Sequence, residues 1–188
     1  MKKVLALTTF IVGSAVSATT LAAPAGQTFV GPSIGLQVNS EKYSVGDTDA
    51  DFKHFSSFNL IGDYGFDFGN DFVGLVQGSV QLGKSNKVAS DDSGTLKRKN
   101  NFMIGYAQGY RILPSLLPYI KLDYNFGKTK WSDTGDNFKV KGFGYGLGTK
   151  FAISQNVELG VEYMRHHLKA DGDSFKSNTF SFLVSYRF

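Results

Sequence analysis

The sequence predicts an all-β protein in which eight antiparallel strands close into an up-and-down transmembrane β-barrel. Three observations support this fold: the composition, a repeated alternation of apolar and polar residues, and connections that alternate between long and short. The 188 residues include 22 Gly, 17 Phe and 9 Tyr. Because each Gly inside a helix costs about 1 kcal/mol, this mixture disfavours a helical bundle. The absence of Cys excludes disulfides, a thiol nucleophile and a thiolate metal site.

Residues 1–25 have the pattern of a cleaved secretory signal peptide, and residues 26–188 form the predicted barrel domain. Lys2 and Lys3 make a basic start that an apolar run and small residues follow, and cleavage after Ala25 or after Ala22 fits. An uncleaved anchor helix is the alternative, which the Gly, Ser and Thr of this stretch disfavour. Loss of both lysines leaves 18 basic against 16 acidic residues, so the charge does not indicate a nucleic-acid partner.

Eight runs of about ten residues alternate between one apolar face and one small or polar face. Ile34 and Leu36, for example, alternate with Gly35 and Gln37. The runs cover residues 29–39, 58–66, 72–82, 102–112, 120–126, 142–153, 157–163 and 180–188. A period of two residues is that of a strand, and eight such runs match the pattern of a transmembrane β-barrel.

The connections between these runs predict the orientation of the barrel. Long polar segments follow the first, third, fifth and seventh runs, at residues 40–54, 84–99, 127–141 and 168–176. Short links occupy residues 67–71, 113–118 and 154–156. Because outer-membrane barrels place long loops outside and short turns in the periplasm, we expect extracellular long loops and two periplasmic termini.

The charged residues of the polar face are expected inside the barrel. They are Asp63, Arg111, Lys121, Asp123, Lys150, Glu158, Glu162 and Arg187. Four acids balance four bases, and an unpaired charge away from water is costly, so we expect them to pair. A row of glycines leaves room for the longer side chains: Gly142, Gly144, Gly146 and Gly148. The interior of eight strands is just wide enough to be filled, which predicts a plugged barrel, with a narrow ion channel as the alternative.

A water-soluble barrel would also alternate, but its apolar face would point inward. The positions of the aromatic residues distinguish the two. Tyr64, Phe66, Tyr110, Phe151, Tyr186 and Phe188 lie near the short connections, and Tyr124, Phe126, Phe143, Tyr163 and Phe180 lie near the long ones. Two aromatic girdles at the strand ends are typical of a barrel whose apolar face meets lipid.

The end of the chain carries a resemblance to a known class. Apolar and aromatic residues alternate back from the last position: Phe180, Phe182, Val184, Tyr186 and Phe188. This pattern resembles the assembly signal that the insertion machinery of bacterial outer-membrane proteins reads. With the signal peptide, the eight runs and Pro118-Tyr119-Ile120, the mature chain resembles the small surface barrels of the opacity and outer-membrane protein A transmembrane-domain type. The resemblance implies a bacterial outer-membrane location and partnership with that machinery.

Some small outer-membrane barrels modify lipid A, so the histidines of this chain are candidate catalytic residues. His54 with Asp92-Ser93 superficially resembles the lipid A palmitoyltransferase, but that family begins with an amphipathic helix for which this chain leaves no space. His166 and His167 resemble part of the lipid A deacylase motif, but no Ser follows two residues later. Adjacent histidines on a strand point to opposite faces, which disfavours a shared metal. We therefore predict no enzyme activity, cofactor or metal site, with a lipid A-modifying enzyme as the alternative.

The predicted function is that of a structural or adhesive surface protein that binds ligands, including a host surface ligand, through its extracellular loops. We expect a monomer. Basic residues near the long connections are candidates for contacts with lipopolysaccharide phosphates: Lys97, Arg98, Lys99, Lys128, Lys139, Lys141 and Arg165. Lys and Arg at strand ends can extend along the apolar surface and place their charge at the headgroups. Outer-membrane lipids are therefore expected partners.

Overall fold

The computed structural model describes residues 28–44, 55–82, 86–91, 94–131, 137–170 and 173–188. Within these ranges the strands are β1 (Gly31–Ser44), β2 (Phe55–Gly69), β3 (Phe72–Leu82), β4 (Asn86–Asp91), β5 (Gly94–Tyr110), β6 (Leu116–Trp131), β7 (Asn137–Ala152), β8 (Val157–Ala170) and β9 (Asp173–Arg187). The described residues contain no helix that is long and apolar enough to cross a membrane.

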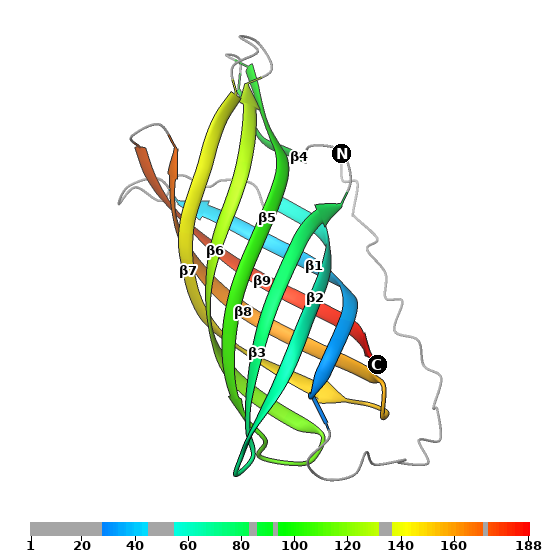
Figure 1. The fold of residues 1–188 in the computed structure, drawn as a ribbon. Helices are drawn as coiled ribbons and strands as arrows, with labels where there is room; N and C mark the ends of the chain where they lie inside the picture. Colours follow the sequence, from blue (N-terminus) through cyan, green and yellow to red (C-terminus); the bar gives the residue numbers. More distant parts are fainter. Residues whose placement is uncertain (1–27, 45–54, 83–85, 92–93, 132–136, 171–172) are drawn as a thin grey trace, which may run out of the picture.

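Eight of these strands form one closed antiparallel barrel. Each strand pairs with its neighbours in the order β3-β2-β1-β9-β8-β7-β6-β5, and pairing between β3 and β5 closes the ring. Figure 1 shows the strands wound obliquely around the barrel. The short strand β4 pairs with the first part of β5 and adds a hairpin beyond the ring. The predicted eight-stranded up-and-down barrel is therefore confirmed.

The side chains alternate between the interior and the outer surface with the predicted period of two. On β1, Ile34 and Leu36 are 48% and 57% exposed, whereas the flanking polar residues Ser33 and Gln37 are buried. The same alternation runs along the other strands of the barrel. An apolar outer surface around a polar interior is the arrangement of a barrel surrounded by lipid, because water would favour the reverse.

The two ends of the barrel differ in their connections. At the short-turn end, β2 joins β3, β5 joins β6 and β7 joins β8. The C-terminus lies at this end as well (Figure 1), where the Phe188 N–H donates to the Pro32 carbonyl oxygen at 3.1 Å. The tight β2–β3 turn uses positive φ angles at Asn70 and Asp71, residue types that tolerate this conformation. The opposite end is called the long-connection end.

The strands extend further toward the long-connection end than the sequence predicts. Much of residues 84–99 and 127–141, interpreted as loops, belongs to β4, β5, β6 and β7. The predicted long loop at residues 168–176 is wrong, because Ala170 pairs with Asp173 across a two-residue link. Its dipeptide Asp171-Gly172 is a hairpin-turn sequence that the polar composition obscured. Polar residues can extend a pair of antiparallel strands, because the hydrogen bonds that join the strands come from the backbone.

Candidate functional site

A neutral cluster of four charges lies inside the short-turn half of the barrel. Lys150 Nζ lies 2.5 Å from Asp63 Oδ2 and 3.0 Å from Glu158 Oε2. Arg187 Nη2 lies 2.8 Å from Asp63 Oδ1 and also donates to Glu158 Oε2 at 3.0 Å, while its Nε pairs with Glu158 Oε1. All four side chains are buried. Each cation thus contacts both carboxylates, which offsets the cost of removing these charges from water.

A second ion pair continues this filling toward the middle of the barrel. Lys121 Nζ lies 3.0 Å and 3.1 Å from the two carboxylate oxygens of Glu162. The hydroxyl of Tyr119 donates to Glu162 at 2.7 Å, and the Gln37 amide donates at 3.3 Å. A Cβ on Gly148 would lie 2.5 Å from the Tyr119 ring, so the absence of a side chain there gives the ring its space.

An apolar plug, which the sequence reasoning missed, fills the interior at the short-turn end. Its buried members are Phe29, Val73, Leu75, Ala107, Leu117 and Tyr119. Phe29 is completely buried and has a φ of 67°. Arg111 is also buried and donates to the Thr28 carbonyl oxygen at 3.1 Å, while its Nη2 lies 3.2 Å from Asp67. The sequence did contain a signal for this plug. Val73 and Leu75 occupy inward-facing positions of β3, where the alternation leads one to expect small or polar residues.

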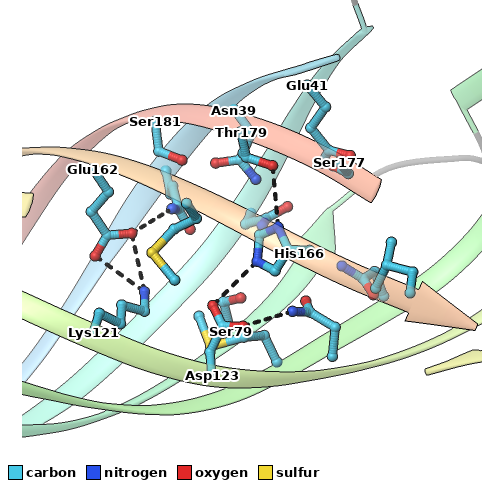
Figure 2. Close-up of a pocket in the computed structure, with 17 residues that line it drawn as sticks. Asn39, Glu41, Ser79, Lys121, Asp123, Glu162, His166, Ser177, Thr179 and Ser181 are labelled. Atoms are coloured by element: carbon cyan, nitrogen blue, oxygen red, sulfur yellow. Dashed lines mark hydrogen bonds and ion pairs between the residues drawn. The ribbon is translucent and has the colours of Figure 1, made fainter. Parts of the chain in front are cut away.

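The long-connection half of the interior contains a cavity of about 40 Å³ (Figure 2). Asn39, Asn59, Asn101 and Ser181 line it, and each has a buried side-chain oxygen with no hydrogen-bond partner among the described residues. A cavity of this size has room for water, which needs roughly 10–15 Å³ per molecule. It is far too small to hold a lipid or a sugar.

Asp123 is buried beside this cavity, and its partners lie outside the predicted set of eight charges. Its Oδ1 accepts from the Asn125 amide at 2.9 Å, and its Oδ2 lies 3.4 Å from His166 Nε2. The other ring nitrogen of His166 lies 3.5 Å from the Thr179 hydroxyl (Figure 2). A Cβ on Gly144 would collide with both Asp123 and His166. The inward parity of His166 was available in the sequence, but its distance from Asp123 was not.

The chain of carboxylate, imidazole and hydroxyl formed by Asp123, His166 and Thr179 does not have the geometry of a nucleophile with its base. Both distances exceed the usual 2.6–3.2 Å. The Thr179 hydroxyl is buried in the barrel, beside a cavity that cannot admit an acyl chain. His167 is exposed on the outer surface, so the two histidines face opposite ways as predicted. No metal-binding group of three His, Asp or Glu residues occurs in the described part of the chain.

Several predicted residues lie outside the described ranges or have no described side chain. His54, Asp92 and Ser93, the residues compared with a palmitoyltransferase, lie outside the described residues, as does the predicted signal peptide at residues 1–25. Of the candidate lipopolysaccharide contacts, Lys139, Lys141 and Arg165 are exposed near the long-connection end of β7 and β8. The other four are placed by their backbones alone: Lys97, Arg98 and Lys99 on β5, and Lys128 on β6.

The outer surface carries the predicted aromatic residues. The side chains of both girdles are exposed, and neighbouring rings contact one another, as in Tyr64–Phe66 and Tyr124–Phe126, each with ring centroids 4.8 Å apart. The residues of the proposed assembly signal all face outward on β9 and at the C-terminus: Phe180, Phe182, Val184, Tyr186 and Phe188.

The comparisons with known proteins agree with this architecture. The family model for the outer membrane protein β-barrel domain matches residues 9–188. The chain therefore belongs to the outer-membrane protein β-barrel family. Membership supports a location in the bacterial outer membrane, with strands that cross the bilayer. The chain matches no curated protein closely enough to count as a relative.

Two solved members of this architecture illustrate the likeness. Neisserial surface protein A is 16% identical, with a TM-score of 0.64, and the match covers 84% of this chain and 97% of that one. Ail, the attachment invasion locus protein of Yersinia pestis, is 21% identical, with a TM-score of 0.57 and coverage of 84% and 96%. Ail has also been solved in complex with the heparin analogue sucrose octasulfate. At these identities the likeness is one of fold.

Proposed function

We propose that this member of the family is a non-enzymatic surface protein, which binds ligands at its long-connection end while its interior stays closed to solutes. The observation that carries the proposal is the filling of the barrel. The apolar plug around Phe29 and the neutral cluster around Lys150 occupy the short-turn half, so the described part of the interior offers a small cavity but neither an open pore nor a substrate-sized pocket. The outer surface and the long connections are then left to interact with other molecules.

The proposed orientation places both termini in the periplasm and the long connections outside the cell. Supporting it, β1 begins and β9 ends at the short-turn end, and the long connections share the other end. Short periplasmic turns and longer external loops are the rule in this class. Protease added to intact cells should therefore cut between β1 and β2 and spare the C-terminus.

Conductance tests the closed interior directly. Reconstituted in planar bilayers, the protein should show no large, stable pore, because charged and apolar side chains fill its short-turn half. A general porin in the same bilayers is the positive control. Reproducible conductance comparable to that of the porin would overturn the closed-barrel part of the proposal and favour the channel alternative.

The ligand class to test first is a sulfated saccharide, because Ail was solved with one. The backbone pairs basic residues across neighbouring strands near the long-connection end: Lys87 with Lys97, Lys97 with Lys130, Lys99 with Lys128, and Lys128 with Lys139. Such pairing brings positive charge together in a region that a polyanion could reach.

Binding of a size-defined heparin fragment to the folded protein in neutral detergent measures this interaction. Replacing Lys97, Arg98 and Lys99 with Gln should weaken it about tenfold, because three charge-assisted contacts are lost. A variant with Gln at Lys141, Arg165 and Lys169 removes the same charge elsewhere and should bind nearly normally. Absence of binding by the unmodified protein would exclude this ligand class.

Assembly in the outer membrane is proposed to depend on the terminal aromatic residue. Deletion of Phe188 should reduce the amount of folded, heat-modifiable protein in the outer membrane severalfold, while export across the inner membrane continues. Phe188 is 73% exposed at the end of β9, so its loss removes little packing inside the barrel. Wild-type levels of folded protein in the deletion strain would contradict this role.

A further inference from the structure

Among the side chains that the structure describes, the exposed basic residues gather on four consecutive strands. Among the described side chains, the exposed Lys and Arg residues are Lys42, Lys139, Lys141, Arg165, Lys169 and Lys176. They lie on the long-connection parts of four consecutive strands, β7, β8, β9 and β1, and are called the basic face. The exposed carboxylates of the described residues, Asp67 and Asp71, lie at the other end of the barrel.

The strand register brings these cations together in rows. Lys141 on β7 lies directly opposite Lys169 on β8. Two residues further along β8, His167 lies opposite Lys176 of β9. Because adjacent strands are about 4.8 Å apart and residues on one face repeat about every 6.8 Å, these side chains share a patch some 10–15 Å across.

The next row of paired residues toward the short-turn end adds two more cations and forms the edge of the patch on that side. Arg165 pairs with Asn178, and Asn178 pairs with Lys42 of β1. Lys42 and Arg165 thus flank a neutral amide, with no described carboxylate on the outer face of these strands to neutralise them.

The pairing of Lys141 with Lys169 is unfavourable by itself. Like charges directly opposite one another destabilise a pair of strands. The described outward residues of β7, β8, β9 and β1 include no Asp or Glu that could relieve this repulsion. An anion bound between the two ammonium groups would convert the repulsion into two charge-assisted hydrogen bonds.

The position of the patch indicates that this anion belongs to a lipid. The next row along the strands is apolar, with exposed Leu147, Tyr163 and Phe180 facing outward in register. Aromatic rings of this kind lie at the interface between hydrocarbon and headgroups. The basic face therefore lies at headgroup level, where Lys and Arg reach phosphates. The Tyr145 and His167 rings, stacked with centroids 6.0 Å apart, lie among the cations.

We propose that the basic face is a binding site for a glycolipid carrying two phosphate groups, one held between Lys141 and Lys169 and the other near Arg165. This inference rests on the orientation proposed above, since it requires the long-connection end to meet the outer leaflet. It uses Lys141 and Arg165 from the lipopolysaccharide contacts predicted from the sequence and adds Lys42, Lys169 and Lys176, which that prediction left out.

The test compares thermal unfolding, followed by heat-modifiable mobility, in vesicles of four compositions. They are neutral phosphatidylcholine alone, and the same lipid with bisphosphorylated lipid A, with monophosphorylated lipid A, or with phosphatidylglycerol at equal charge. Bisphosphorylated lipid A should raise the midpoint most, monophosphorylated lipid A less, and phosphatidylglycerol least. Equal shifts with phosphatidylglycerol and bisphosphorylated lipid A would overturn the two-phosphate site.

Three variants locate the effect. The variant K141Q/R165Q/K169Q should lose most of the lipid A shift and bind lipid A about tenfold more weakly. The charge-preserving variant K141R/R165K/K169R should keep most of the shift. The variant K97Q/R98Q/K99Q on β5 removes the same number of charges and should also keep most of it. Equal losses in both Gln variants would show a diffuse electrostatic effect and overturn the site.

The single variant Lys169→Gln should shift the thermal unfolding midpoint in opposite directions in neutral vesicles and in lipid A vesicles. In neutral vesicles its midpoint should be slightly higher than that of the unmodified protein, because the repulsion with Lys141 is removed. In lipid A vesicles its midpoint should be lower, because a phosphate ligand is lost. A shift of the same sign in both media would overturn the site.

The failure of this inference can be distinguished from the failure of the proposed function. A closed barrel without a lipid A shift would contradict this inference alone, whereas porin-like conductance would contradict the proposed function alone.

Discussion

Toward the short-turn end, the barrel interior is filled by apolar side chains and by charges that form a neutral cluster, whereas toward the long-connection end it holds a cavity lined by amides and hydroxyls. Lys150 and Arg187 each contact two carboxylates in the first half. In the second half, Asn39, Asn59 and Ser181 have buried oxygens without a hydrogen-bond partner among the described residues. The same eight strands thus enclose a half filled by apolar side chains and paired charges and a half with room for water.

This difference shows where the barrel resists substitution. Removing one member of a fully paired, buried set leaves the remaining charges uncompensated, whereas removing a group that has no protein partner costs little. The short-turn half should therefore control stability, and the long-connection half should tolerate change near the proposed ligand-binding end. Four substitutions test this difference, from the largest expected effect to the smallest.

Lys150→Met should cause the largest loss, about 3–5 kcal/mol of unfolding free energy, because Asp63 and Glu158 would then share Arg187 alone. Urea unfolding in neutral bilayers measures the loss. The double variant Lys150→Met with Asp63→Asn restores a neutral cluster and should recover more than half of it. A loss below about 1 kcal/mol in the single variant would mean that the cluster does not hold this half together.

Phe29→Ala should cost about 3 kcal/mol, because the fully buried ring fills the plug between β3, β5 and β6. The same unfolding assay applies. Phe29→Leu keeps most of the apolar volume and should cost much less. Equal losses in the two variants would show that the ring packs less tightly than its burial indicates.

Gly148→Ala should cost about 2 kcal/mol, since the new methyl group would displace the Tyr119 ring and weaken its bond to Glu162. Gly78→Ala is the matched control on β3. A Cβ at Gly78 would meet only the Met103 carbonyl oxygen, at 3.8 Å, within 4 Å, so that variant should retain its stability. Similar losses in both would point to a backbone effect of Gly in strands.

Ser181→Ala and Ser185→Ala compare the two halves directly, because both serines are buried on the inner face of β9. Ser185 donates to Glu158 at 3.3 Å, and its loss should cost about 1 kcal/mol. The Ser181 hydroxyl lines the cavity and has no hydrogen-bond partner in the part of the chain that the structure describes, so its loss should change stability by less than about 0.5 kcal/mol. A larger loss at Ser181 than at Ser185 would reverse the comparison.

Local pattern was enough to predict much of this molecule. The period of two assigns each residue of a strand to a face, which placed Asp63, Lys150 and Glu162 inside and the aromatic girdles outside. Strand ends were predicted less well, because backbone hydrogen bonds can extend a pair of strands whatever the polarity of their side chains. The residues 168–176, interpreted as a loop, show this clearly.

The sequence by itself determined the class of the protein, the number of barrel strands and the face on which each charge lies, because these follow from residues one or two positions apart. Only the tertiary structure decided which charges meet. Lys150 contacts Asp63 across 87 residues, and Arg187 contacts Asp63 across 124. The plug around Phe29, the pairing of Asp123 with His166 and the basic face likewise depend on ring closure and strand register, which bring distant residues together and which no local period encodes.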